Sequence, residues 1–133
     1  MQKLLLMTLP LGLVAACSDK NDAAEEKLER AAETSATVAG PTPAALGLSE
    51  AQLLDADIVG SDGREVGEVA QVLRDASGKV ERLLVELEGP GDRYVHVPIL
   101  GLTPVVRGTD TDLQTTMTKA RLDALPEVKL PAP

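Results

Sequence analysis

The sequence has almost no aromatic residues, cysteine or histidine. Its 133 residues include no Trp or Phe and only one Tyr, one Cys and one His. One cysteine cannot form a disulfide within the chain, and a zinc site normally draws on several Cys or His side chains. Proteins that bind single-stranded nucleic acid stack the bases on several aromatic rings. The sequence therefore argues against these three features, and any core must be built from Leu, Val, Ile and Ala.

Positive charge is also scarce. The chain has 13 Lys and Arg residues against 21 Asp and Glu residues, which gives a net charge of −8 at pH 7. Binding to a phosphate backbone depends on Lys and Arg side chains that neutralise the phosphates. We therefore expect an acidic, solvated surface and no nucleic-acid partner.

The sequence contains no catalytic motif. His96, the single histidine, alternates with apolar residues in a short segment, where a packing role is the simpler interpretation. A Ser-His-Asp triad needs a nucleophile motif that is missing here. The acidic pairs Asp55 with Asp57 and Asp110 with Asp112 fit turns and strand ends better than an acid–base pair. The sequence predicts a protein that is not an enzyme, with no catalytic residue, no metal and no cofactor.

Residues 1–16 have the pattern of an export signal. Lys3 supplies a positive charge, and the apolar run over residues 4–16 is shorter than the roughly 20 residues of a bilayer-spanning helix. Such a run suits the hydrophobic region of a secretory signal peptide. Small residues at its end, Ala15 and Ala16, come directly before Cys17. An ordinary signal peptide followed by an incidental cysteine is the alternative interpretation.

The stretch that ends at Cys17 resembles the lipobox of bacterial lipoproteins. The resemblance implies cleavage between Ala16 and Cys17, and fatty acylation (palmitate) of Cys17. Because two or more acyl chains anchor stably, the mature protein would be held at a membrane without a transmembrane span. Ser18, in place of Asp, resembles the pattern that sorts lipoproteins to the outer membrane of Gram-negative bacteria, which implies a location on the periplasmic side.

Residues 17–47 are rich in Ala, Glu, Thr, Pro and Gly. Residues 22–33 contain good helix formers, and Glu26 stands four residues before Arg30, a spacing that favours an ion pair on a helix. Leu28 is the one large apolar residue there, so an isolated helix would be marginal. Two prolines, Pro41 and Pro43, favour an extended chain further on. The sequence predicts a flexible tether over residues 17–47, and the alternative is a short helix that docks on a partner.

Residues 48–130 are predicted to form a compact all-β domain. Its centre is a hairpin between turns at Asp62-Gly63 and Asp75–Gly78, because Asp bonds to its own backbone and Gly adopts positive φ. The apolar positions change phase near Gly67, which predicts a bulge or sharp bend. About six short strands are expected at 56–59, 65–74, 80–87, 94–98, 103–107 and 113–117, with short helices at 49–54 and from Thr118 to Pro126. Such spacing favours a small barrel, and closure would protect the sheet edges.

Four motifs of this domain resemble the PRC-barrel domain, which is named from the photosynthetic reaction-centre H subunit. They are V-G-E-V at 66–69, R-D-x-x-G-K-V-E-R-L-L-V at 74–85, Y-V-H-V-P at 94–98 and L-x-A-L-P at 122–126. The resemblance covers about residues 50–128. It implies a small, highly bent β-barrel with a short C-terminal helix, used mainly for protein binding or assembly.

These patterns together predict a non-catalytic, lipid-anchored periplasmic module that binds or assembles proteins. The protein partner is not identified by the sequence. The expected contact surface is the outward face of the third strand with the loop after it, represented by Arg82, Glu86, Glu88 and Arg93. One alternative is an envelope stress or structural lipoprotein that self-associates, for example as a homodimer. Another is a small-ligand binder or enzyme with an acidic pocket.

Overall fold

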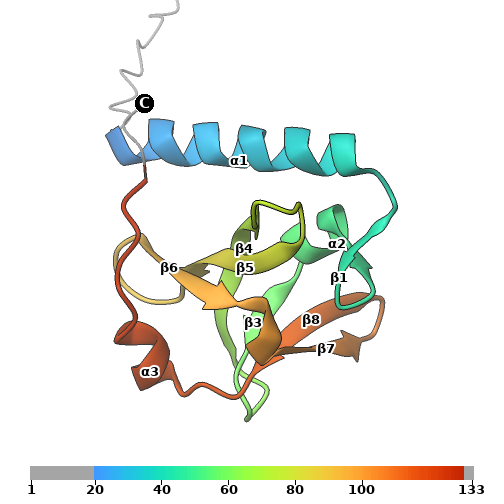
Figure 1. Ribbon diagram of the computed structural model, residues 1–133. Helices are drawn as coiled ribbons and strands as arrows, with labels where there is room; N and C mark the ends of the chain where they lie inside the picture. The colour runs from blue at the N-terminus through green and yellow to red at the C-terminus, as the bar shows by residue number, and fades with distance from the viewer. Residues whose placement is uncertain (1–19, 131–133) are drawn as a thin grey trace, which may run out of the picture.

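The computed structural model describes residues 20–130, which form one bent sheet with a long helix lying along it (Figure 1). The export signal and the predicted lipid-acceptor Cys17 lie outside the described residues. The larger sheet has six strands in the order β6-β5-β4-β3-β8-β7. Its strands are β3 (Asp57–Val59), β4 (Glu65–Arg74), β5 (Val80–Leu87), β6 (Arg93–Pro98), β7 (Leu102–Arg107) and β8 (Asp110–Thr115). Neighbouring strands are antiparallel except β3 and β8, which are parallel.

Two Asp-Gly turns fix the central strands, as the sequence predicted. Gly63 and Gly78 have φ values of 81° and 85°, which favour glycine. Gly78 N donates to Asp75 O at 3.0 Å, and Asp75 Oδ1 accepts from Ser77 N at 2.8 Å. The turn between β4 and β5 is therefore closed by hydrogen bonds made within the turn itself.

The predicted irregularity near Gly67 is confirmed. The register between β3 and β4 shifts between the pairs Ile58–Gly67 and Val59–Glu65, which leaves Val66 as an extra residue. Both Val66 and Gly67 are buried as a result. A bulge of this kind bends a strand and increases its twist.

The hydrophobic core consists of aliphatic residues, mostly from the strands and the two short helices. From β5 it includes Leu83 and Val85, which pair with Val97 and Val95 of β6, and also Leu87. The alternation predicted for β5 holds except at Leu84, which is buried as well. Two short helices close the core, and each begins where the sequence predicted.

The capping residues of these helices explain their positions. The helix α2 (Glu50–Leu54) starts at Ser49, whose side chain accepts from Gln52 N while the Gln52 side chain accepts from Ser49 N. The helix α3 (Lys119–Asp123) starts at Thr118, whose hydroxyl accepts from Arg121 N at 3.2 Å. Each cap satisfies backbone donors that would otherwise be unpaired.

The expectation of a closed barrel is wrong, because the sheet is open. Within the described residues, β6 and β7 end the sheet on opposite sides and do not pair. They are joined by a short 3-10 turn, η1 (Ile99–Gly101), after which β7 pairs with β8. Pro98 ends β6 and Pro104 lies in β7, and proline cannot donate to a strand ladder. Val128 N donates to Tyr94 O at 2.7 Å and covers part of the β6 edge.

Within the described residues, the segment expected to be a flexible tether contains regular structure. It forms α1 (Lys20–Ala39), followed by a small hairpin of β1 (Pro43–Ala45) and β2 (Leu48–Ser49). Gly40 ends the helix with φ 65° and donates from N to Ala36 O at 3.0 Å. The helix has the length of a bilayer span but not the apolarity, and no helix of the described range qualifies as one.

The sequence favoured a tether over the alternative of a short helix because Leu28 is the one large apolar residue in this segment. Ala24, Ala32 and Ala36 are buried and Leu28 is half-buried, all at four-residue intervals on one face. Alanine is the best helix former, and its small side chain lets the helix lie close to the sheet. Packing against the domain therefore stabilises a helix that would be marginal alone.

Candidate functional site

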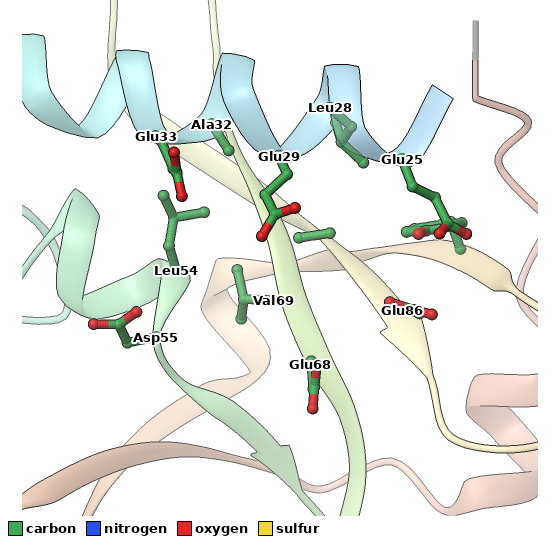
Figure 2. A pocket seen from close by; sticks show the side chains of 12 residues that line it. Glu25, Leu28, Glu29, Ala32, Glu33, Leu54, Asp55, Glu68, Val69 and Glu86 are labelled. Carbon is green, nitrogen blue, oxygen red and sulfur yellow. The ribbon is translucent and has the colours of Figure 1, made fainter. Parts of the chain in front are cut away.

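A groove of about 360 Å³ lies between α1 and the outer face of the sheet (Figure 2). One wall is α1, the other is formed by β4, β5 and β6, and α2 closes one end. Two smaller hollows lie near the loop that follows β5. The volume of the groove is at the low end of the range for ligand pockets.

The floor of the groove is apolar. Its residues are aliphatic except for one tyrosine: Leu28, Ala32, Leu54, Val69, Ala70 and Tyr94. Leu28, Leu54 and Ala70 remain partly exposed. The groove therefore offers apolar surface that the fold itself does not fill.

The rim of the groove is acidic on both sides. Its residues are all carboxylates: Glu25, Glu29, Glu33, Asp55, Glu68 and Glu86. Figure 2 shows the three α1 carboxylates pointing toward the sheet, across from those of β4 and β5. None of the lining residues, all of which lie in the described range, is Lys, Arg or His.

The carboxylates at one end of the groove perturb one another. One side-chain oxygen each of Glu25, Glu86 and Asp92 lies within 4.8 Å of the other two. Burial raises the pKa of Glu25, and the neighbouring Asp92 raises it further. Burial likewise raises the pKa of Glu86, with added repulsion from Asp92 and Glu68. Burial, and then Glu86 and Glu25, raise the pKa of the Tyr94 hydroxyl. The groove therefore has a strongly negative potential.

A second acidic group continues this surface. Oxygens of Asp57, Glu65 and Glu68 lie within 4.8 Å of one another, and Glu68 also lines the groove. Burial raises the pKa of Asp57, and Asp112 raises it further. Burial also raises the pKa of Glu65, followed by repulsion from Asp57. Carboxylate oxygens suit hard cations, but each group supplies three side chains, whereas Ca²⁺ takes six to eight oxygens.

Two of the four residues predicted for partner binding, Glu86 and Glu88, line a smaller hollow next to the groove, and Glu88 and Arg93 line another. Glu86 lies in the groove and is half-buried, while Arg82 and Glu88 are exposed. Arg93 is half-buried and donates from Nη2 to Leu125 O at 2.7 Å, so it holds the C-terminal segment. His96 does not line the groove; burial lowers its pKa, and the charge of Arg82 lowers it further.

The sequence interpretation missed the contribution of α1 to the site. Glu25, Glu29 and Glu33 repeat at four-residue intervals, one position after the buried stripe that begins at Ala24. This spacing places the three carboxylates along one side of the helix, next to the face that packs. The repeat was visible in the sequence, but its meaning depended on recognising the alanine stripe as a packing face.

The comparisons with known proteins agree with the strand pattern. The family model of the PRC-barrel domain matches residues 49–121, which is more than half of the chain. None of the curated proteins gives a significant match. The matched range begins at the cap of α2 and ends within α3, so it contains the whole six-stranded sheet, whereas α1 precedes it. The chain therefore belongs to the PRC-barrel family.

Proposed function

We propose that the protein is a non-catalytic, lipid-anchored module that docks a protein partner in the groove between α1 and the sheet. In this proposal Cys17 carries the lipid, and the domain lies on the periplasmic side of the outer membrane. The observation that supports it best is the concave groove itself, where partly exposed apolar side chains lie beside several carboxylates, because binding sites are concave and combine apolar lining with a few polar groups.

The position of α1 in the chain adds support. The helix begins at Lys20, close to the predicted lipid acceptor, and forms one wall of the groove. The element that would join the anchor to the domain is thus also part of the docking surface. This arrangement suits a module that holds a partner at a membrane.

The anchor is tested by labelling cells with a fatty acid while they express the wild type, Cys17→Ser or Ser18→Ala. We expect label on the wild type and on Ser18→Ala, and none on Cys17→Ser, which should keep its signal segment. Label on the Cys17→Ser protein would overturn the anchor.

The docking surface is tested by placing a photocrosslinking amino acid at position 54, in the groove, or at position 100. Leu100 is 96% exposed and does not line the groove, so it is the matched control. We expect one envelope protein to crosslink from position 54 only, and to be lost when Ala32→Gln is added. Equal crosslinking from both positions would contradict this surface.

Self-association is the second candidate function, and the open sheet favours it. The outer edge of β7 is not paired within the described residues, and Val106 on this strand is 74% exposed. Unpaired edges can pair with a second copy of the chain. The oligomeric state of the full chain decides between the two candidates.

A further inference from the structure

We propose that the groove recognises a short basic, amphipathic segment of the partner, with apolar side chains on the floor and Lys or Arg side chains between the two carboxylate rows. This inference rests on the proposed docking function, but it does not depend on the lipid anchor.

The two rows of carboxylates provide the charge complementarity. Glu25, Glu29 and Glu33 come from α1, and Glu68 and Glu86 face them from the sheet (Figure 2). Glu25 Oε1 is buried and has no hydrogen-bond partner among the described residues. A cationic side chain between the rows would donate to such oxygens. It would also offset the burial and the repulsion that together raise the pKa of Glu25 and Glu86.

The spacing of the α1 row suggests the form of the segment. Residues four apart on a helix are separated by about 6 Å along its axis. Alternate side chains of an extended chain are separated by roughly 6.5 Å, which is nearly the same interval. A segment with basic residues at alternate positions would therefore match successive carboxylates. The volume of about 360 Å³ admits side chains of such a segment rather than a whole helix, whose diameter is about 10 Å.

Other classes of partner fit this surface less well. Nucleic acids and anionic bilayers carry the same sign of charge as the rim and would be repelled. A small cation would neutralise the carboxylates but would leave Leu28, Leu54 and Ala70 exposed. The combination of apolar floor and acidic rim favours a ligand that is both apolar and basic.

Binding in this groove can be followed by the intrinsic fluorescence of the protein. Tyr94 is its single aromatic residue, and it lines the groove at the Glu25 end. Fluorescence of the full chain in detergent therefore reports on this site alone. The probe is an aromatic-free peptide of sequence KLKSKLKS. Two control peptides replace its Leu residues with Ser or its Lys residues with Glu.

We expect the probe to change Tyr94 emission in a saturable way and to bind more weakly at higher salt. Replacing Leu with Ser should weaken binding about tenfold, because two leucine side chains would lose their apolar contact. The Lys-to-Glu peptide should not bind. An unchanged emission at high probe concentration, or equal affinity of the Leu and Ser peptides, would overturn the proposal.

Two matched double variants test whether the probe binds in the groove or is only attracted by the net negative charge of the protein. Glu29→Gln with Glu68→Gln removes two charges from the rim, and Glu81→Gln with Glu127→Gln removes two exposed charges that do not line it. We expect the first pair to weaken probe binding about three- to tenfold and the second less than twofold. Equal weakening by both pairs would show non-specific attraction and would overturn the assignment. A partner that crosslinks from position 54, together with failure of the probe to bind, would leave the docking function standing and overturn only the basic segment.

Discussion

Gly67 marks a very close approach between β4 and β5. A Cβ atom at this position would lie 2.7 Å from Glu86 O and 2.8 Å from Val85 Cγ1. Neither the backbone oxygen nor the buried valine can move away freely. We therefore expect Gly67→Ala to lower the free energy of unfolding by about 1–3 kcal/mol, as measured by chemical denaturation. Gly101→Ala is the control, because a Cβ there meets no atom within 4 Å, and it should change stability by less than about 0.5 kcal/mol.

The ion pair between Glu50 and Arg74 ties α2 to the central hairpin. Arg74 Nη2 donates to Glu50 Oε1 at 3.0 Å, and Nη1 donates to Gly78 O at 2.9 Å. Glu50 is 1% exposed, so Arg74→Met would leave a buried carboxylate without its partner. We expect a loss of about 1–3 kcal/mol in urea unfolding, since the arginine is partly exposed. In a double-mutant cycle, Glu50→Gln with Arg74→Met should cost less than the sum of the single changes; strict additivity would rule out the coupling.

The long helix α1 is attached to the sheet mainly by small side chains. Ala32 is 5% exposed against the sheet, whereas its neighbour Ala31 faces solvent. Ala32→Gln should push the helix away from the sheet and raise amide hydrogen exchange over residues 24–36 by about tenfold, which corresponds to ~1.4 kcal/mol. Exchange in β4 and β5 should stay unchanged. Ala31→Gln has the same chemistry on the solvent side, so an equal effect there would contradict the packing described for α1.

The attachment of α1 should also depend on pH. Burial raises the pKa values of Glu25 on α1 and Glu86 on β5 above the ordinary 4.5, and repulsion from Asp92 raises both further. These carboxyl groups therefore bind protons more tightly when α1 is packed on the sheet than when it is detached. The packing of α1 should weaken as pH rises from about 4.5 through the raised pKa values, and strengthen as pH falls.

Protection factors of the α1 amides, corrected for intrinsic exchange, measure this dependence between pH 4.5 and 7. Glu25→Gln with Glu86→Gln should give higher protection at pH 7 and a flatter profile. The Tyr94 hydroxyl stays protonated across this range, because its pKa is raised above 10. A wild-type profile as flat as that of the double variant would contradict the role of these carboxylates.

The elements that could be predicted from sequence are those with local signals. The two Asp-Gly turns, Ser49 and Thr118 mark where strands and helices begin, and the six strands were located within a few residues of their observed bounds. The alternation in β5 identified its buried face. These signals act over a few residues, so they do not depend on the tertiary structure.

The features that could not be predicted depend on contacts between distant segments. The alanine stripe of α1 has meaning only once the sheet face it covers is known, and the open edge depends on where β7 turns after η1. The part of the candidate site that α1 contributes was missed for the same reason. Glu86 was identified from its strand, but Glu29 belongs to a segment expected to be flexible.

At the scale of the whole molecule, the six-stranded sheet ends in two edge strands within residues 20–130, β6 and β7, and each edge is protected differently. Residues near Val128 cover part of β6, whereas β7 carries Pro104, which has no N–H to offer to another strand. Pro104→Val should therefore increase self-association, detected as a concentration-dependent rise in mass by light scattering. Pro90→Val, in the loop before β6, is the control and should leave the mass unchanged. If Pro104→Val stays at the wild-type mass, proline does not protect this edge.

The length and placement of α1 would set how far the domain stands from a bilayer. A helix of 20 residues is a rod of about 30 Å. If Cys17 is acylated, the rod starts only a few residues from the lipid. While it lies along the sheet, the domain would be held close to the membrane surface. If α1 came off the sheet, the domain could stand farther from the bilayer by roughly the length of the helix. Because the packing of α1 should weaken as pH rises, the pH of the surrounding compartment would then set this distance.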